Sequence, residues 1–242
     1  MGFRLRCKNR GQVHAATVQQ CNSSCRSTAL GLLCGLCNPE SSHTVKQRYF
    51  DICVALRRLC DDIARCHPEF RHVDMSRVAV AYAQTRSPAE WGTQAKLTPM
   101  RFERGALTCM RDGRRWGAQQ LYLDGEEMLY ILTFYLPRFL NLPFDEKLVT
   151  VFHELYHISP AFDGDIRRFA GSCYIHTGSQ AEYDRRMVVY AAEYLAQLPQ
   201  EHFPEYLRYD FAELKRRHGA VIGLRLSIPR LIALDRVDDD AA

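Results

Sequence analysis

The sequence HELYH occupies positions 153–157, within a stretch whose apolar residues recur with helical spacing. Residues four apart share one face of an α-helix, so His153 and His157 can both reach one zinc ion at about 2.0 Å. Glu154 follows the first histidine, where a carboxylate can contact a zinc-bound water without being a ligand. Alternatively, the histidines are only polar residues on a core helix. In that case nothing would offset the free-energy cost of burying the Glu154 carboxylate between them. The spacing therefore predicts a metal site beside a carboxylate base.

A third ligand must come from elsewhere, because a catalytic zinc usually takes three protein ligands and leaves the fourth position to water. His176 is the first candidate, since it lies between two glycines in a short segment that can fold back over the metal. Asp163 and Asp165 are alternatives, although a carboxylate there can equally fix a histidine tautomer without touching the ion. The remaining candidates each have another explanation: helix capping for Glu182, an exposed helix face for Glu193 and simple burial for Cys173.

The elements around this motif follow from hydrophobic periodicity and turn residues. A capping box at Thr44 and Gln47 opens an amphipathic pattern, which predicts a helix that ends before Pro68. Strands are predicted at residues 77–84, 96–103, 119–123 and 128–136. Further helices are predicted at residues 145–158, which carry the motif, from Ser179 to Pro199, and at residues 204–218 with Gly219 as the stop.

Composition excludes several classes of protein. The 242 residues are 47% hydrophobic and 25% charged, the balance of a globular protein with one sizeable core or two small ones. The longest apolar run, residues 128–136, is much shorter than the roughly 20 residues of a membrane-spanning helix, so we expect no membrane crossing. The net charge of +4 comes from interspersed charges, which is weak support for a nucleic-acid partner.

Residues 1–43 differ from the rest, because they lack a sustained period and are rich in Ser, Asn, Gln, Gly and Cys. We expect a leader, disordered or created by a start codon assigned too far upstream, ahead of one domain over residues 44–242. Four of its cysteines offer an alternative, a closed tetrahedral zinc site: Cys21, Cys25, Cys34 and Cys37. Three later cysteines have helical spacing and apolar neighbours, which favours core side chains in the reducing cytoplasm: Cys53, Cys60 and Cys66.

The stretch HELYHISPAFDGDIRRFAGSCYIH resembles the phage metallopeptidase family, a zincin-like group related to the SprT-like and Spartan peptidases. The upstream segments RVAVAYAQTRS and LTPMRFE add to this resemblance, which covers about residues 45–235. It implies that His153 and His157 are zinc ligands and that Glu154 is the catalytic base. SprT-like members take the third ligand from a downstream histidine, which His176 matches in kind and roughly in spacing.

The resemblance also implies an α+β, zincin-like fold. In this fold an N-terminal helix and the HExxH helix pack against a small mixed sheet, and further helices follow. The expected reaction is hydrolysis of a peptide bond in a peptide or protein substrate. Zinc lowers the pKa of its bound water and polarises the carbonyl, while Glu154 carries the proton from that water to the leaving amine.

Substrate contacts are less defined by the sequence. Three tyrosines are candidate donors to the oxyanion, although each is as easily a packing residue: Tyr174, Tyr183 and Tyr190. The strand at residues 128–136 is a candidate for pairing with an extended substrate, although its apolar character argues equally for a buried strand.

Two other functions remain open. One is a non-catalytic protein with a structural zinc, in which a side chain such as Cys173 fills the open position. The other is a nucleic-acid-associated peptidase with a basic C-terminal part, although such charges usually form a solvated face: Arg208, Lys215, Arg216, Arg217, Arg225 and Arg230.

Overall fold

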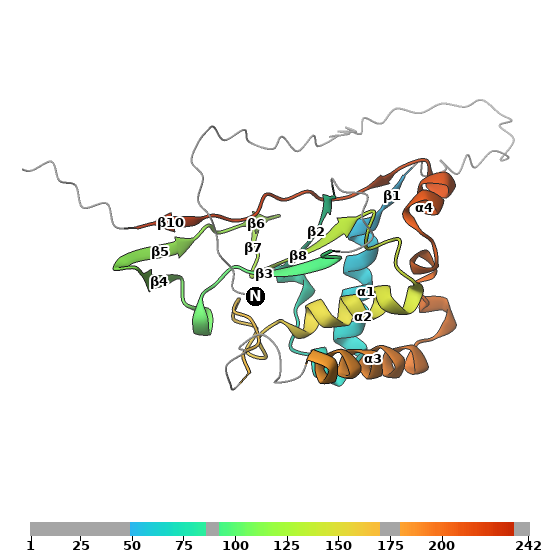
Figure 1. The fold of residues 1–242 in the computed structure, drawn as a ribbon, viewed down its shortest axis with the longest axis horizontal. Coiled ribbons are helices and arrows are strands. Elements are labelled where there is room, and N and C mark those ends of the chain that lie inside the picture. Colours follow the sequence, from blue (N-terminus) through green and yellow to red (C-terminus); the bar gives the residue numbers. More distant parts are fainter. Residues whose placement is uncertain (1–48, 86–91, 170–179, 235–242) are drawn as a thin grey trace, which may run out of the picture. The chain divides into compact units, whose positions relative to one another are not determined.

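A computed structural model describes residues 49–85, 92–169 and 180–234, and they form an α+β arrangement (Figure 1). The helices are α1 (Ile52–Cys66), α2 (Phe144–Tyr156), α3 (Gln180–Gln197) and α4 (Phe211–His218). The strands are β1 (Phe50–Asp51), β2 (Val78–Gln84), β3 (Ala95–Pro99), β4 (Thr108–Arg111), β5 (Arg114–Ala118), β6 (Tyr122–Leu123), β7 (Glu126–Glu127), β8 (Tyr130–Leu136), β9 (Val221–Ile222) and β10 (Leu231–Ala233). Across these described ranges, no helix combines the length and apolar character that a membrane span requires.

The sheet next to the motif helix is mixed and has the order β2-β8-β3. Strand β8 runs parallel to β2 and antiparallel to β3, with Leu132 opposite both Val80 and Leu97. Because β8 has a partner on each side, its backbone has no free edge. The suggestion that residues 128–136 pair with a substrate is therefore wrong, and β3 is the edge strand on that side of the sheet.

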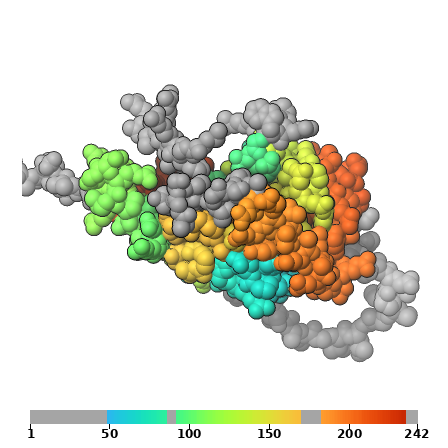
Figure 2. Space-filling view, turned by 60° about the horizontal axis from the view of Figure 1, so that its bottom comes forward, coloured from blue at the N-terminus to red at the C-terminus, as the bar shows by residue number. Residues whose placement is uncertain are grey.

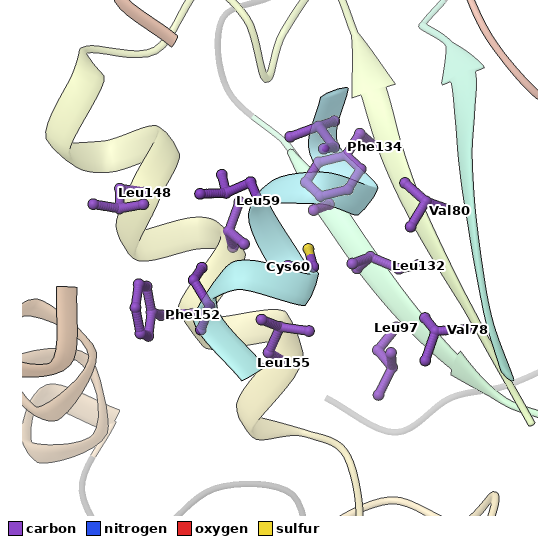
Figure 3. Close-up of a cluster of buried hydrophobic side chains, with 14 of the residues drawn as sticks. Leu59, Cys60, Val78, Val80, Leu97, Leu132, Phe134, Leu148, Phe152 and Leu155 are labelled. Atoms are coloured by element: carbon purple, nitrogen blue, oxygen red, sulfur yellow. The ribbon is translucent and has the colours of Figure 1, made fainter. Parts of the chain in front are cut away.

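One face of this sheet packs against α1 and α2, as the resemblance implies (Figure 3). Figure 3 shows the side chains that meet there, from the sheet and from both helices: Val78, Val80, Leu97, Leu132, Phe134, Leu59, Cys60, Leu148, Phe152 and Leu155. The other face carries a smaller buried cluster: Ala79, Ala81, Met100, Met128 and Ile131. The motif helix is thus held by a core on the side away from solvent.

Helix α1 begins later than the capping box predicts. Thr44 and Gln47 lie outside the described residues, and the helix begins at Ile52, where the Asp51 side chain accepts the Val54 N–H at 3.0 Å. Phe50 and Asp51 are extended because they pair in parallel with β9. Cys53 and Cys60 are buried as predicted, whereas the prediction for Cys66 is wrong, because its side chain is exposed.

Three other predicted elements are shorter than expected. The strand predicted at residues 119–123 is reduced to β6, Tyr122–Leu123. The strand at residues 96–103 ends at Pro99, and the chain then turns through Arg104 and Gly105, both with positive φ. The helix predicted at residues 204–218 is divided into a 3-10 turn and α4, whose cap is Asp210. The sheet β10-β5-β4 was missed, because its strands are exposed and lack apolar alternation.

A buried lysine fixes the position of α2 against the later part of the chain. The Lys147 ammonium donates to the Leu207 and Tyr209 carbonyl oxygens, each at 2.8 Å. Burial lowers the Lys147 pKa to about 8, against the raising effect of Asp210 and Glu213. Two carbonyls outside α2 therefore hold the helix that carries the motif.

Candidate metal and catalytic site

The two motif histidines lie on one face of the end of α2, as their spacing predicts. His153 is in the last turn, and His157 is the residue that caps the helix. Their ring centroids are 4.8 Å apart, and the ring planes are inclined by 77°. After His157 the chain leaves the helix, and Ile158 forms an isolated bridge with Ile166. The arrangement brings two imidazoles close enough to share one ion.

Glu154 points from α2 to the edge of the sheet. Its Oε2 accepts the Leu97 backbone N–H at 2.6 Å, and the residue is only 9% exposed. Burial raises the Glu154 pKa to about 7, although the Leu97 hydrogen bond and the charge of Lys96 act in the opposite direction. A carboxyl with a pKa near neutrality can take and return a proton at neutral pH.

Tyr183 from α3 packs against both motif histidines. Its ring centroid is 4.8 Å from that of His153 and 5.7 Å from that of His157, and the side chain is 1% exposed. Its hydroxyl donates to the His153 carbonyl oxygen at 3.4 Å. In this conformation the Tyr183 hydroxyl is directed to the backbone, and its ring packs against both imidazoles. Tyr190 likewise packs among aromatic rings, and Tyr174 lies outside the described residues.

Asp184, the next residue of α3, is a neighbour of the site that the sequence analysis missed. Its Oδ1 is 3.9 Å from Nδ1 of His153. A carboxylate near the second nitrogen of a metal-binding imidazole helps to fix the orientation of the ring. No spacing rule links positions so far apart in the chain, so the sequence alone carried no signal for this contact.

Asp163 and Asp165, which follow the motif, stabilise a turn through hydrogen bonds. Asp165 accepts from the Arg168 guanidinium at 2.8 and 2.9 Å, and also from the backbone N–H groups of Arg104 and Ile166. Asp163 accepts the Asp165 N–H at 3.1 Å. These hydrogen bonds account for both carboxylates without a metal.

Within the part of the chain that the structure describes, no group of three or more His, Cys, Asp or Glu side chains is placed to hold a metal ion. Asp163, Asp165, Glu182 and Glu193 therefore do not complete a three-residue site with the two histidines there. Glu193 instead contacts His67 at 3.3 Å, and Glu182 is an exposed neighbour of Arg186. His176 and Cys173 lie outside the described residues.

We expect Asp165→Asn to lower the free energy of unfolding by about 2–3 kcal/mol without loss of metal, because a buried carboxylate loses charge-assisted hydrogen bonds. Urea denaturation measures the first quantity, and metal analysis measures the second. Asp163→Asn is the matched control, since it weakens one backbone contact and should cost about 1 kcal/mol or less. A metal-free Asp165→Asn protein would instead identify Asp165 as a ligand.

The basic residues near the end of the described chain contact their own neighbours. The Arg208 guanidinium lies 4.7 Å from the Phe203 ring centroid, and that of Arg217 lies 3.9 Å from the Tyr209 ring centroid. Arg217 also pairs with Glu213 at 3.1 Å. These contacts give Arg208 and Arg217 partners within the protein itself.

A cleft of about 650 Å³ lies between α1 and residues 201–206. Its lining includes Arg58, Tyr194 and Phe203, and none of the motif residues contributes to it. The motif therefore does not line this cleft.

Comparison with known proteins places the sequence beside a described family. The family model described as Putative phage metallopeptidase matches residues 48–177, from the start of the described chain past the motif. No curated protein matches the chain, and no solved structure matches it.

Proposed function

The chain belongs to the Putative phage metallopeptidase family, and from this premise we propose that it is a zinc-dependent peptidase. The observation that carries the proposal is the geometry at the end of α2. Two imidazoles share one helix face with their centroids 4.8 Å apart, and Glu154 is buried beside them against the edge of β3. Two ligands and a base are thus held by one rigid helix.

The donor set fits zinc, because neutral imidazole nitrogens are among its preferred ligands. When bound, the ion supplies a Lewis acid that polarises the scissile carbonyl and lowers the pKa of a bound water. His153 and His157 would hold it, with Asp184 orienting the His153 ring. Glu154 takes a proton from water on its carboxylate and returns it to the leaving amine.

We propose His176 as the third ligand. Phe169 contacts the Tyr156 and Tyr183 rings, with centroids 6.2 and 6.3 Å away. In Figure 2 the start of α3, in orange, lies beside the gold segment that follows the motif. The chain is therefore next to the motif both before and after residues 170–179, which contain His176.

An extended peptide is the proposed substrate, and β3 is the proposed strand with which it pairs. This strand is at the edge of the sheet, and the Leu97 N–H touches the catalytic carboxylate directly. A peptide added along this edge would pass the reacting groups, as in other complexes where a strand is added to a sheet.

Residues 44–242 are proposed as the peptidase domain and residues 1–43 as a separate leader. The whole leader, with its four candidate zinc-binding cysteines, lies outside the described residues. Helix α3 lies outside the segment matched by the family model, yet it supplies Tyr183 and Asp184 to the site. The proposed domain is therefore longer than the matched segment.

Removal of the metal tests the function. We expect the purified protein to contain one zinc, to hydrolyse fluorescently labelled casein, and to lose this activity on treatment with 1,10-phenanthroline. Stoichiometric zinc should restore the activity, because the fold holds the ligands on a rigid helix. Mass spectrometry gives the metal content, and fluorescence release gives the rate. A protein that binds zinc and hydrolyses no casein would favour the non-catalytic alternative.

A further inference from the structure

The β4–β5 hairpin ends in two arginines that lie directly opposite each other. Asp112 and Gly113 form its two-residue turn, both with positive φ, and Arg111 of β4 pairs with Arg114 of β5. Both arginines are exposed, and neither guanidinium forms an ion pair or a hydrogen bond with any described residue, including Asp112. Like charges in this position destabilise an antiparallel pair. An anion at the tip of the hairpin would remove that repulsion.

Strand β10 runs antiparallel to β5 and leads towards this tip (Figure 1). The Leu234 N–H donates to the Arg115 carbonyl oxygen at 2.9 Å, so the pairing continues to these two residues. The same register places residue 235 opposite Arg114, on the same face of the sheet. Because hydrogen-bonded and non-hydrogen-bonded pairs alternate, this next pair is a non-hydrogen-bonded one, in which opposite side chains are closest.

Residue 235 begins an acidic stretch of the sequence. Residues 235–242 read DRVDDDAA and follow directly after Leu234, where the described residues end. Four of the eight residues are aspartates: Asp235, Asp238, Asp239 and Asp240. Opposite charges across a strand pair are stabilising. The register of β10 and the charge of this stretch therefore point to the same contact, between Asp235 and Arg114.

We propose that residues 235–240 are the partner of the arginine pair within the same chain, with Asp235 beside Arg114 and the other three aspartates around the tip. The hairpin tip is then an anion-binding surface that the protein's own acidic segment covers. A polyanion reaches the two arginines only by displacing this segment, so the contact limits the binding of such molecules. This inference does not depend on the proposed peptidase activity.

Disulfide trapping tests the register. Cys109 lies on the same face as Arg111, two residues away, and is first replaced by serine so that it cannot compete. In this background, Arg114→Cys with Asp235→Cys should form a disulfide within one chain under mild oxidation, because opposite residues lie within the distance range of disulfides. Mass spectrometry of tryptic peptides identifies the bond.

Arg115→Cys with Asp235→Cys is the matched control, because adjacent residues of a strand point to opposite faces; we expect about one tenth of the yield or less. Equal yields from the two pairs would overturn the proposal. A disulfide between two chains would identify a second copy as the occupant of the tip and would overturn it as well.

A fluorescent heparin hexasaccharide tests whether the segment covers the arginines. Replacement of all four aspartates by asparagine in the full chain should tighten its binding about tenfold at low salt, because several exposed ion pairs of modest strength are lost together. The same replacement in an Arg111→Gln, Arg114→Gln protein should tighten binding less than about threefold, because only the overall charge then changes. Fluorescence anisotropy measures each affinity.

Two results of this measurement would overturn the proposal. Equal tightening in both backgrounds would show that only net charge matters. No binding of the hexasaccharide by the protein with four asparagines would show that the tip is not an anion-binding surface. The thermal midpoint of each variant shows whether it is folded.

Discussion

Glu154→Gln is expected to lower kcat for peptide hydrolysis by about 10²- to 10⁴-fold, while the protein keeps its metal and its fold. The amide preserves the shape of the side chain and an oxygen that can accept the Leu97 N–H, but it cannot take a proton from water. Burial raises the pKa of this carboxyl, so removal of its negative charge should not destabilise the protein.

The measurement compares kcat on a fixed peptide, zinc content and thermal midpoint for the variant and the wild type. Glu146→Gln is the matched control, because Glu146 is an exposed residue in the first turn of the same helix. Loss of zinc in Glu154→Gln would show that this residue is a ligand or a structural partner. Unchanged hydrolysis would refute the proposed mechanism.

His153→Ala and His157→Ala are each expected to reduce the zinc content from one ion per protein to nearly none. Each substitution removes one of two ligands held by a single helix face. Loss of a residue that only hydrogen-bonds to a ligand lowers metal affinity about 10–100-fold, and loss of a ligand itself should lower zinc affinity by more. His176→Ala should be equally severe if His176 is the third ligand. Titration against a competing chelator measures all three affinities.

His202→Ala is the control for this series, because His202 is an exposed residue of a 3-10 turn away from the motif. If His153→Ala carries the same zinc as wild type, the central claim about the site is refuted. If only His176→Ala retains zinc, the third ligand lies elsewhere.

The motif helix could be predicted from the sequence because its determinants are local. The histidine spacing, the apolar face of α2 and its end near His157 all depend on residues within a few turns. The strands β2 and β8 were also predicted to within two residues, since both are buried apolar runs with high β-propensity.

The contacts that complete the site could not be predicted, because they join residues far apart in the chain. The Leu97 N–H meets Glu154 only through the packing of α2 beside β3, and Tyr183 meets both histidines only through the docking of α3. The start of α1 was misplaced for the same reason, since β9 holds Phe50 and Asp51 in an extended conformation.

The parallel pairing of β1 with β9 also bears on how the protein is made. The residues that enter α1 are paired with residues made much later, and Cys53 Sγ contacts the Leu224 carbonyl 171 positions along the chain. During translation, α1 and the motif helix therefore leave the ribosome well before the strand that secures the first turn of α1 exists. Because contacts of such long sequence separation form slowly, we expect the pairing of β1 with β9 to be a late step of folding. A nascent chain that stops short of β9 would therefore lack the pairing that holds Phe50 and Asp51 extended at the start of α1.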